Sequence, residues 1–157
     1  MSSSANAAAT VLRHVEQCMG TVFSLDVRAP GIDKAALDDT LAWLHWVDAT
    51  FSTYQPDSEV RRLGCGELEL ADASPEVGEI LRRCTDLEDE TGGYCSAYAG
   101  GELDPSGLVK GWAIEQASAR LVAAGAINHT LNDGGDVQCA GSAGRGQPWR
   151  IGVADRV

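Results

Sequence analysis

The stretch LDPSGLVKGWAIE, residues 103–115, has the composition of a helix but carries two glycines in its interior. Asp104 is a good N-cap and Pro105 is a good first helical residue. A glycine inside a helix costs about 1 kcal/mol relative to alanine. Gly107 and Gly111 are four residues apart, so they share one face of the predicted helix. The absence of side chains at both positions of this face therefore requires a structural or functional explanation.

Two interpretations of the bare face follow from the residues alone. Two glycines let another group approach the backbone closely, and that group can be a neighbouring element of the fold or a ligand. The start of a helix carries unpaired N–H groups and the positive end of the dipole, which attract anions. Lys110 adds a mobile cation suited to phosphate. The segment predicts either a phosphate or pyrophosphate site, or close helix–sheet packing beside a solvated lysine.

Periodicity and turn residues predict the other elements outward from this helix. The predicted elements are a half-buried strand at 20–28, a helix from Lys34 to about Ala49 capped by Asp33, a helix from Pro75 to about Thr91 ended by Gly92 and Gly93, the helix from Pro105 to about Ala124 ended by Gly125, a strand at 126–131, a tight turn at 132–136, a return strand at 137–141 and a last strand at 149–155. Residues 51–66 and 94–102 are expected to be irregular connectors. This order predicts an α+β fold, with helices packed on a mostly antiparallel sheet.

Length and composition restrict the class of protein. A chain of 157 residues suits one domain, which we expect at 14–157 after a flexible N-terminus at 1–13. The net charge of −11 argues against nucleic acid and anionic membranes as partners. No signal peptide or transmembrane run is apparent. Five cysteines without C-x-x-C spacing predict free thiols, which fits the cytoplasm.

The second candidate site is the stretch LNDGGDV at 131–137. A plain hairpin turn explains it. Alternatively, Gly134 and Gly135 turn backbone N–H groups toward a ligand, with the carboxylate of Asp136 beside them. Tyr54 could stack on a ring, although a tyrosine taken alone is more often a partly buried structural residue. The sequence contains no evident Ser/His/Asp triad and designates no catalytic residue.

Six segments in this order resemble the successive blocks of the ApbE-type FAD:protein FMN transferases. They are MGTVFSLDV at 19–27, FSTYQPDSEVRRL at 51–63, TGG at 91–93, LDPSGLVKGWAIE at 103–115, NDGGDVQCAG at 132–141 and WRIGVAD at 149–155. The resemblance covers about residues 17–155 and implies an ApbE-like, T-fold-like domain. It also implies a magnesium-dependent transfer of FMN from FAD to a threonine hydroxyl of a target flavoprotein, with release of AMP.

The resemblance also implies roles for individual residues. Those expected to contact FAD or line its pocket are Met19, Tyr54, Tyr94, Cys95, Ser96, Asp104, Lys110, Gly134, Gly135 and Asp136. Gly107 is expected to offer its backbone carbonyl to the magnesium ion.

The chain departs from the family pattern in two places. Tyr94, Cys95 and Ser96 follow the TGG block where the family has a small residue, Phe and Asp, so an aspartate is lost. The family's C-terminal D-A-x-x-T block with the other metal ligands, and its histidine segment, have no counterpart here, so the domain is expected to be truncated at its C-terminus. The alternatives are therefore a non-catalytic FAD-binding module or remnant, and an unrelated α+β domain.

Overall fold

The computed structural model describes residues 11–30, 32–144 and 146–153. In chain order its elements are β1 (Val11–Cys18), β2 (Thr21–Arg28), α1 (Lys34–Phe51), α2 (Glu59–Gly64), the short 3-10 helix η1 (Leu70–Asp72), α3 (Pro75–Glu90), α4 (Ser106–Ala123), β3 (His129–Asn132) and β4 (Val137–Ala140). The strands form one sheet in the order β1-β2-β3-β4, and each neighbouring pair is antiparallel. The predicted α+β class is confirmed.

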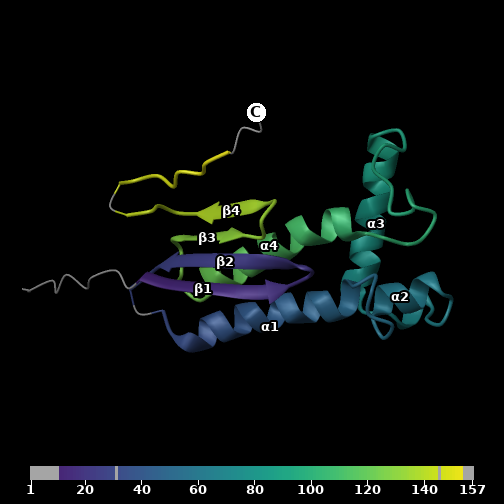
Figure 1. Ribbon diagram of the computed structural model, residues 1–157, viewed down its shortest axis with the longest axis horizontal. Coiled ribbons are helices and arrows are strands. Elements are labelled where there is room, and N and C mark those ends of the chain that lie inside the picture. Colours follow the sequence, from purple (N-terminus) through teal and green to yellow (C-terminus); the bar gives the residue numbers. More distant parts are fainter. Residues whose placement is uncertain (1–10, 31, 145, 154–157) are drawn as a thin grey trace, which may run out of the picture.

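The helices α1 and α4 cover one face of this sheet. Figure 1 shows α4 passing behind the strands and α1 running along the β1 side. Strand β2 turns Phe23, Leu25 and Val27 into the layer between sheet and helices, where each is at most 2% exposed. The alternation predicted for residues 20–28 is confirmed, because alternate side chains of a strand face opposite sides of the sheet.

The contact between α1 and α4 is built largely from aromatic rings. Trp43 stacks on Trp46 at 5.0 Å between ring centroids, and Trp112 of α4 meets Trp43 edge-on at 5.2 Å. Phe51, the last residue of α1, lies 5.5 Å from Trp112. The indole N–H of Trp43 donates to the carbonyl of Ala113 at 3.1 Å. Large rings at this contact fix how the two helices cross.

The helix boundaries follow the predicted capping residues closely. Asp33 caps α1 by accepting the N–H of Ala36 at 2.9 Å. Gly125, with φ of 85°, ends α4 as predicted. The start of α4 differs by one residue: Pro105 occupies the N-cap position, and Asp104 lies before it. Asp104 still caps the helix, since its carboxylate accepts the N–H of Ser106 at 3.0 Å.

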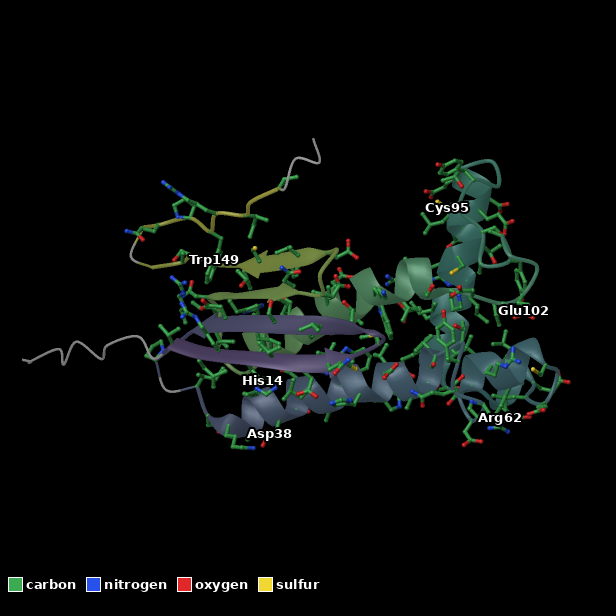
Figure 2. The ribbon with its side chains drawn as sticks, in the orientation of Figure 1. His14, Asp38, Arg62, Cys95, Glu102 and Trp149 are labelled. Atoms are coloured by element: carbon green, nitrogen blue, oxygen red, sulfur yellow. The ribbon has the colours of Figure 1, made fainter. Side chains whose placement is uncertain are left out.

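Strand β1 was not predicted, because its polarity pattern is inverted. Val11 and Val15 are 50% and 66% exposed on the open face of the sheet, while His14 and Glu16 face α1. Figure 2 shows His14 on this side. Glu16 accepts hydrogen bonds from His14 at 2.9 Å and from His45 of α1 at 3.0 Å. The predicted flexible segment 1–13 is therefore wrong for 11–13, and residues 1–10 lie outside the described part.

Two further expectations are corrected. The connector at 51–66 contains α2, which begins after Ser58 because this side chain accepts the N–H of Arg61 at 3.1 Å. The predicted last strand is absent from residues 149–153, and Ala154 and Asp155 lie outside the described residues. Ile151 and Val153 are 51% and 91% exposed, so alternation there has no core to face.

The segment after β4 is held by Trp149 rather than by a strand ladder. Figure 2 shows Trp149 reaching from this segment toward the sheet. Its indole N–H donates to the carbonyl of Ala140 at 2.8 Å, and the guanidinium of Arg28 lies over its ring at 4.7 Å. Within the described residues, no helix combines the length and the apolar character needed to cross a bilayer.

Candidate functional site

Two hairpin turns and the start of α4 meet at one end of the sheet (Figure 1). A pocket of about 380 Å³ opens between the β1–β2 turn, the C-terminal end of α1 and the first turns of α4. Its lining residues, here called the lysine pocket, are Met19, Gly20, Asp48, Phe51, Ser52, Thr53, Tyr54, Gln55, Asp104, Ser106, Val109 and Lys110. Four predicted site residues from three separate sequence blocks, Met19, Tyr54, Asp104 and Lys110, therefore share one pocket.

The turn that brings Met19 to the pocket is strained. Met19 has φ of 52° and Gly20 has φ of 70°, and together they connect Cys18 to Thr21 in a two-residue hairpin. Positive φ suits glycine but is uncommon for a long side chain. Backbone strain of this kind is concentrated at functional sites. The strain at Met19 is consistent with a position selected for what its side chain faces.

Tyr54 is held outside the core by a local turn. The hydroxyl of Ser52 accepts the N–H groups of Tyr54 at 3.2 Å and Gln55 at 3.1 Å. Tyr54 is 95% exposed, so it is not a structural tyrosine buried in the core. Its ring is available for stacking on a planar ligand at the mouth of the lysine pocket.

The first turn of α4 offers fewer free N–H groups than the sequence predicts. The N–H of Ser106 is bound by Asp104, and those of Leu108 and Val109 donate to the carbonyl of Pro105. Lys110 is half-buried in the pocket wall and makes no salt bridge within the described residues. Lys110 is therefore the more available donor for an anion at this helix start than the backbone of the first turn.

The two glycines of α4 do not make room for close packing against another element of the fold. A Cβ added at Gly107 or Gly111 would meet no atom within 4 Å, and both residues are exposed. The close helix–sheet packing that was an alternative explanation is therefore wrong. The face between them is open to solvent, as a ligand would require.

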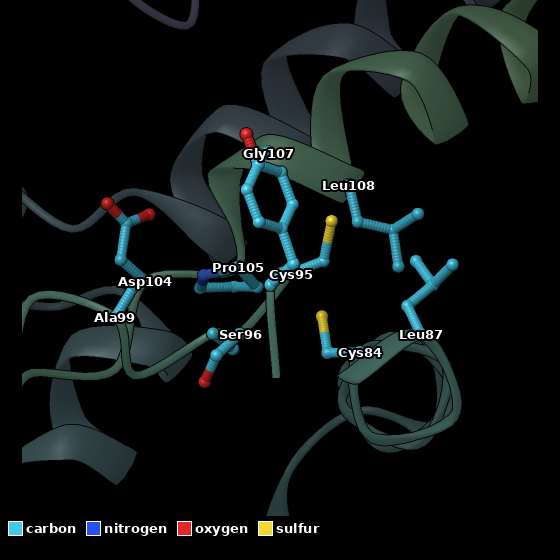
Figure 3. Close-up of a pocket in the computed structure, with 11 residues that line it drawn as sticks. Cys84, Leu87, Cys95, Ser96, Ala99, Asp104, Pro105, Gly107 and Leu108 are labelled. Carbon is cyan, nitrogen blue, oxygen red and sulfur yellow. The ribbon is translucent and has the colours of Figure 1, made fainter. Parts of the chain in front are cut away.

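A second pocket, of about 280 Å³, lies on the other side of Asp104. We call it the thiol pocket. Its lining residues are Cys84, Leu87, Tyr94, Cys95, Ser96, Ala97, Ala99, Asp104, Pro105, Gly107 and Leu108. Figure 3 shows the carboxylate of Asp104 at one side and two sulfur atoms at the other. The predicted residues Tyr94, Cys95, Ser96 and Gly107 belong to this pocket, and Asp104 belongs to both pockets.

The turn at Gly134, Gly135 and Asp136 belongs to neither pocket. The N–H of Gly134 donates to the side chain of Asn132 at 2.7 Å, and those of Gly135 and Asp136 donate to Asp133 at 2.9 and 2.7 Å. These N–H groups are therefore not free for a ligand. The second carboxylate oxygen of Asp133 is buried and has no partner in the described structure. Thr21 donates to the carbonyl of Asp133, which places the turn beside the β1–β2 turn.

The described residues do not form a magnesium site by themselves. They contain no group of three or more His, Cys, Asp or Glu side chains placed to hold a metal ion. The thiol pocket offers the carboxylate of Asp104 and the backbone of Gly107. Magnesium prefers six oxygen ligands in octahedral geometry, so these two groups do not fit the ion without further ligands.

Cys18 is excluded as a nucleophile. It is 3% exposed and donates to the carbonyl of Leu44 at 3.3 Å. Burial, followed by the negative charge of Asp48, raises the pKa of the Cys18 thiol to about 11. A thiol with this pKa is almost entirely protonated at neutral pH.

Sequence reasoning missed several residues of the two pockets. Asp48 and Phe51 come from the end of α1; Phe51 opens the FSTY block, and Asp48 shortly precedes it. Cys84 lies on the helix predicted from Pro75 to about Thr91, and the sequence assigns it no role in a site. No sequence signal shows that its thiol faces a segment more than ten residues away.

Comparison with known proteins identifies the class of fold. The chain superimposes on a mutant of the flavin transferase ApbE from Vibrio cholerae with a TM-score of 0.80, at 20% identity over 95% of this chain and 69% of that chain. The apo form of the flavinyl transferase ApbE from Pseudomonas stutzeri gives 0.78, at 19% identity, with coverage of 93% and 66%. The ApbE protein from Thermotoga maritima gives 0.78, at 18% identity, with coverage of 93% and 64%.

These matches show the fold of the ApbE flavin transferases, and the chain spans about two thirds of the length of those proteins. The model of the ApbE family matches residues 19–100 and 96–157 of the sequence. The chain therefore belongs to the ApbE family. A search of curated proteins found none that matches it.

Proposed function

We propose that the chain carries the FAD-binding part of an FAD:protein FMN transferase. The reaction would move FMN from FAD to a threonine hydroxyl of a target flavoprotein and release AMP. The observation that carries the proposal is the lysine pocket, in which Met19, Tyr54, Asp104 and Lys110 meet although they lie far apart in the sequence. Membership of the ApbE family supports the same chemistry.

Each of these side chains has a role that its chemistry allows. Lys110 provides the positive charge for the pyrophosphate of FAD, and its flexible stem lets the ammonium follow the phosphate oxygens. Tyr54 offers an exposed ring for stacking on a flavin or adenine ring. Asp104 borders both pockets, so it is suited to fix how a dinucleotide crosses from one to the other.

The bond changes of the proposed reaction are those of a phosphoryl-type transfer. The threonine oxygen forms a bond with the phosphorus of the FMN part, and the bond from this phosphorus to the AMP oxygen breaks. The threonine proton passes to solvent water, and AMP leaves with the electron pair of the broken P–O bond. Lys110 stabilises the negative charge that develops on the phosphate oxygens in the transition state. Magnesium dependence and the carbonyl role of Gly107 rest on the family resemblance alone.

The test is a turnover assay on this chain with FAD, magnesium chloride and a threonine-bearing flavoprotein domain as acceptor. The expected result is release of AMP in equal amount to flavin that stays on the acceptor after acid precipitation. A reaction with EDTA and one with a Thr→Val acceptor serve as controls. Absence of both products would contradict transferase activity for this chain.

A non-catalytic FAD-binding module is the second candidate. It is favoured by the lack of a metal-holding group in the part of the chain that the structure describes. Titration of FAD, followed by its fluorescence, separates the two functions. Binding without turnover supports the module, whereas turnover excludes it. The cytoplasmic location of the chain, and a threonine-bearing flavoprotein as the acceptor, are predictions from the sequence.

A further inference from the structure

The thiol pocket contains two cysteines whose thiols take part in no bond change of the proposed transfer. Cys84 lies on α3, and Cys95 lies on the irregular segment that follows this helix. Figure 3 shows both sulfur atoms directed into the same pocket, with Leu87 and Leu108 beside them. Neither cysteine is in a disulfide. Two thiols that face one small apolar space can react with each other when one of them is oxidised.

The local backbone explains why Cys95 returns to α3. Gly92 and Gly93, with φ of 62° and 88°, reverse the chain directly after the helix. The N–H of Cys95 then donates to the hydroxyl of Thr91 at 3.0 Å. Thr91 lies two helical turns after Cys84, on the same face. Cys95 is therefore tethered above the α3 face that carries Cys84, by a segment whose glycines allow adjustment.

The two thiols differ in access to solution. Cys95 is exposed, whereas Cys84 is 9% exposed. Burial, and after it the negative charge of Glu88, raise the pKa of the Cys84 thiol. A dissolved disulfide can therefore reach Cys95 first, because attack needs both access and a thiolate. Cys84 is placed to attack only a sulfur that is already inside the pocket.

We propose that Cys95 and Cys84 form a redox-modification site for low-molecular-weight disulfides such as oxidised glutathione. The Cys95 thiolate attacks one glutathione sulfur, the glutathione S–S bond breaks, and one reduced glutathione leaves. The Cys84 thiolate then attacks the Cys95 sulfur, and the second reduced glutathione leaves with the remaining proton. Two protein thiols are oxidised to one disulfide, and one glutathione disulfide is reduced to two thiols.

The bridge has a consequence for the lysine pocket. A disulfide holds its two Cα atoms within roughly 7 Å of each other, so it would fix the segment around Cys95 against α3 and place two bonded sulfur atoms inside the thiol pocket. Asp104 lies at the end of this segment and borders both pockets. Oxidation is therefore expected to weaken FAD binding. This consequence rests on the proposed function, whereas formation of the bridge does not.

The experiment equilibrates the chain in buffers of increasing oxidised-to-reduced glutathione ratio, blocks free thiols with iodoacetamide and maps peptides by mass spectrometry. The expected product is a Cys84–Cys95 linked peptide, with loss of two alkylation sites. In Cys84→Ser, Cys95 is expected to keep a bound glutathione. Cys65→Ser is the matched control, because Cys65 is exposed but lies outside the thiol pocket, and its bridge should form as in the unchanged chain.

Three outcomes of the mapping would overturn the proposal. They are the same glutathione adduct at Cys95 with and without Cys84, no oxidation of either cysteine across the series, and a bridge that uses Cys65. FAD titration of the reduced and oxidised chains is the second readout. A higher Kd for the bridged chain than for the reduced chain supports the coupling, and an equal Kd overturns it. Failure of the reduced chain to bind FAD contradicts the proposed function, and the peptide map still decides the thiol site.

Discussion

Lys110 is one of two lysines in the chain, and the two have opposite surroundings. Lys110 lies in the wall of the lysine pocket beside Ser106 and Asp104. Lys34 lies at the far end of α1, is largely exposed, and pairs with Asp38 at 2.7 Å. The chain therefore contains its own control for the role of a lysine charge.

Replacing Lys110 with alanine should weaken FAD binding by roughly 10- to 100-fold. This range corresponds to the loss of a charged hydrogen bond worth about 1.5–3 kcal/mol. Fluorescence titration of FAD measures the change. The Lys34→Ala variant should keep the affinity of the unchanged chain. If Lys110→Ala binds FAD with the affinity of the unchanged chain, Lys110 is not part of the FAD site.

His129 is buried in neutral form between two partners. Its Nδ1 donates to the carbonyl of Ala126 at 2.6 Å, which leaves Nε2 to accept the hydroxyl proton of Ser118 at 2.8 Å. Burial is the main cause that lowers the pKa of His129, and the hydrogen bond to Ala126 opposes it. The folded chain therefore binds a proton at His129 less readily than the unfolded chain does.

The free energy of unfolding should fall as the pH drops below the unfolded value of about 6.5, until the lowered folded pKa is reached. The free energy of unfolding falls because the unfolded state, in which His129 has the higher pKa, takes up a proton at a higher pH than the folded state does. The slope from this one group is at most about 1.4 kcal/mol per pH unit. Urea unfolding at about pH 7.5 and 5.5 measures it. His129→Asn, which cannot titrate, should lose this part of the slope, and an identical slope in both chains would contradict the role of His129.

At the scale of elements, sequence periodicity predicts those strands and helices whose apolar side faces the core. It predicts β2 because Phe23, Leu25 and Val27 are buried. It misses β1 because valines face outward there and Glu16 faces α1. The predicted last strand fails for the reverse reason, since alternation at 149–153 has no buried face. Tertiary contacts decide both cases, and they are not visible in one segment.

The candidate site shows the same limit. Sequence blocks supply the candidate residues, but not their division into two pockets that share Asp104. Met19, Tyr54 and Lys110 lie in the lysine pocket, whereas Tyr94, Cys95, Ser96 and Gly107 lie in the thiol pocket, and this division depends on how α1, α3 and α4 meet. The Cys84–Cys95 pair depends on the chain reversal at Gly92 and Gly93. Such neighbours are set by three-dimensional packing rather than by spacing.

Two glycine substitutions test the element scale in opposite directions. Gly111→Ala in α4 should raise the free energy of unfolding by about 0.5–1 kcal/mol, because the helix gains propensity and the new methyl meets nothing. Gly134→Ala should lower it by about 1–2 kcal/mol, because φ there is +88° and Thr21 Oγ1 lies 3.3 Å from the new Cβ. Chemical denaturation of both variants measures the difference. Destabilisation by Gly111→Ala would mean that its face is in contact after all.

At the scale of the whole molecule, the net charge of −11 determines how the stability of the fold responds to salt. Like charges repel more in the compact state than in the expanded chain, and the Debye length falls to about 10 Å at 0.1 M salt. Raising sodium chloride from about 20 to 200 mM should therefore raise the urea midpoint. Potassium chloride should act equally, because screening depends on ionic strength. A falling midpoint would mean that ion pairs such as Arg28–Asp26 at 2.9 Å outweigh the repulsion.

The aromatic contact between α1 and α4 also makes the molecule its own optical probe. Three of the four tryptophans, Trp43, Trp46 and Trp112, are in one cluster, and Phe51 connects that cluster to the lysine pocket. Indole emission overlaps flavin absorption, so a flavin bound there would quench the three indoles by energy transfer. Trp149 lies apart from the cluster, beside Ala140. Light emitted by the unlabelled chain can therefore report whether a flavin has bound near the cluster.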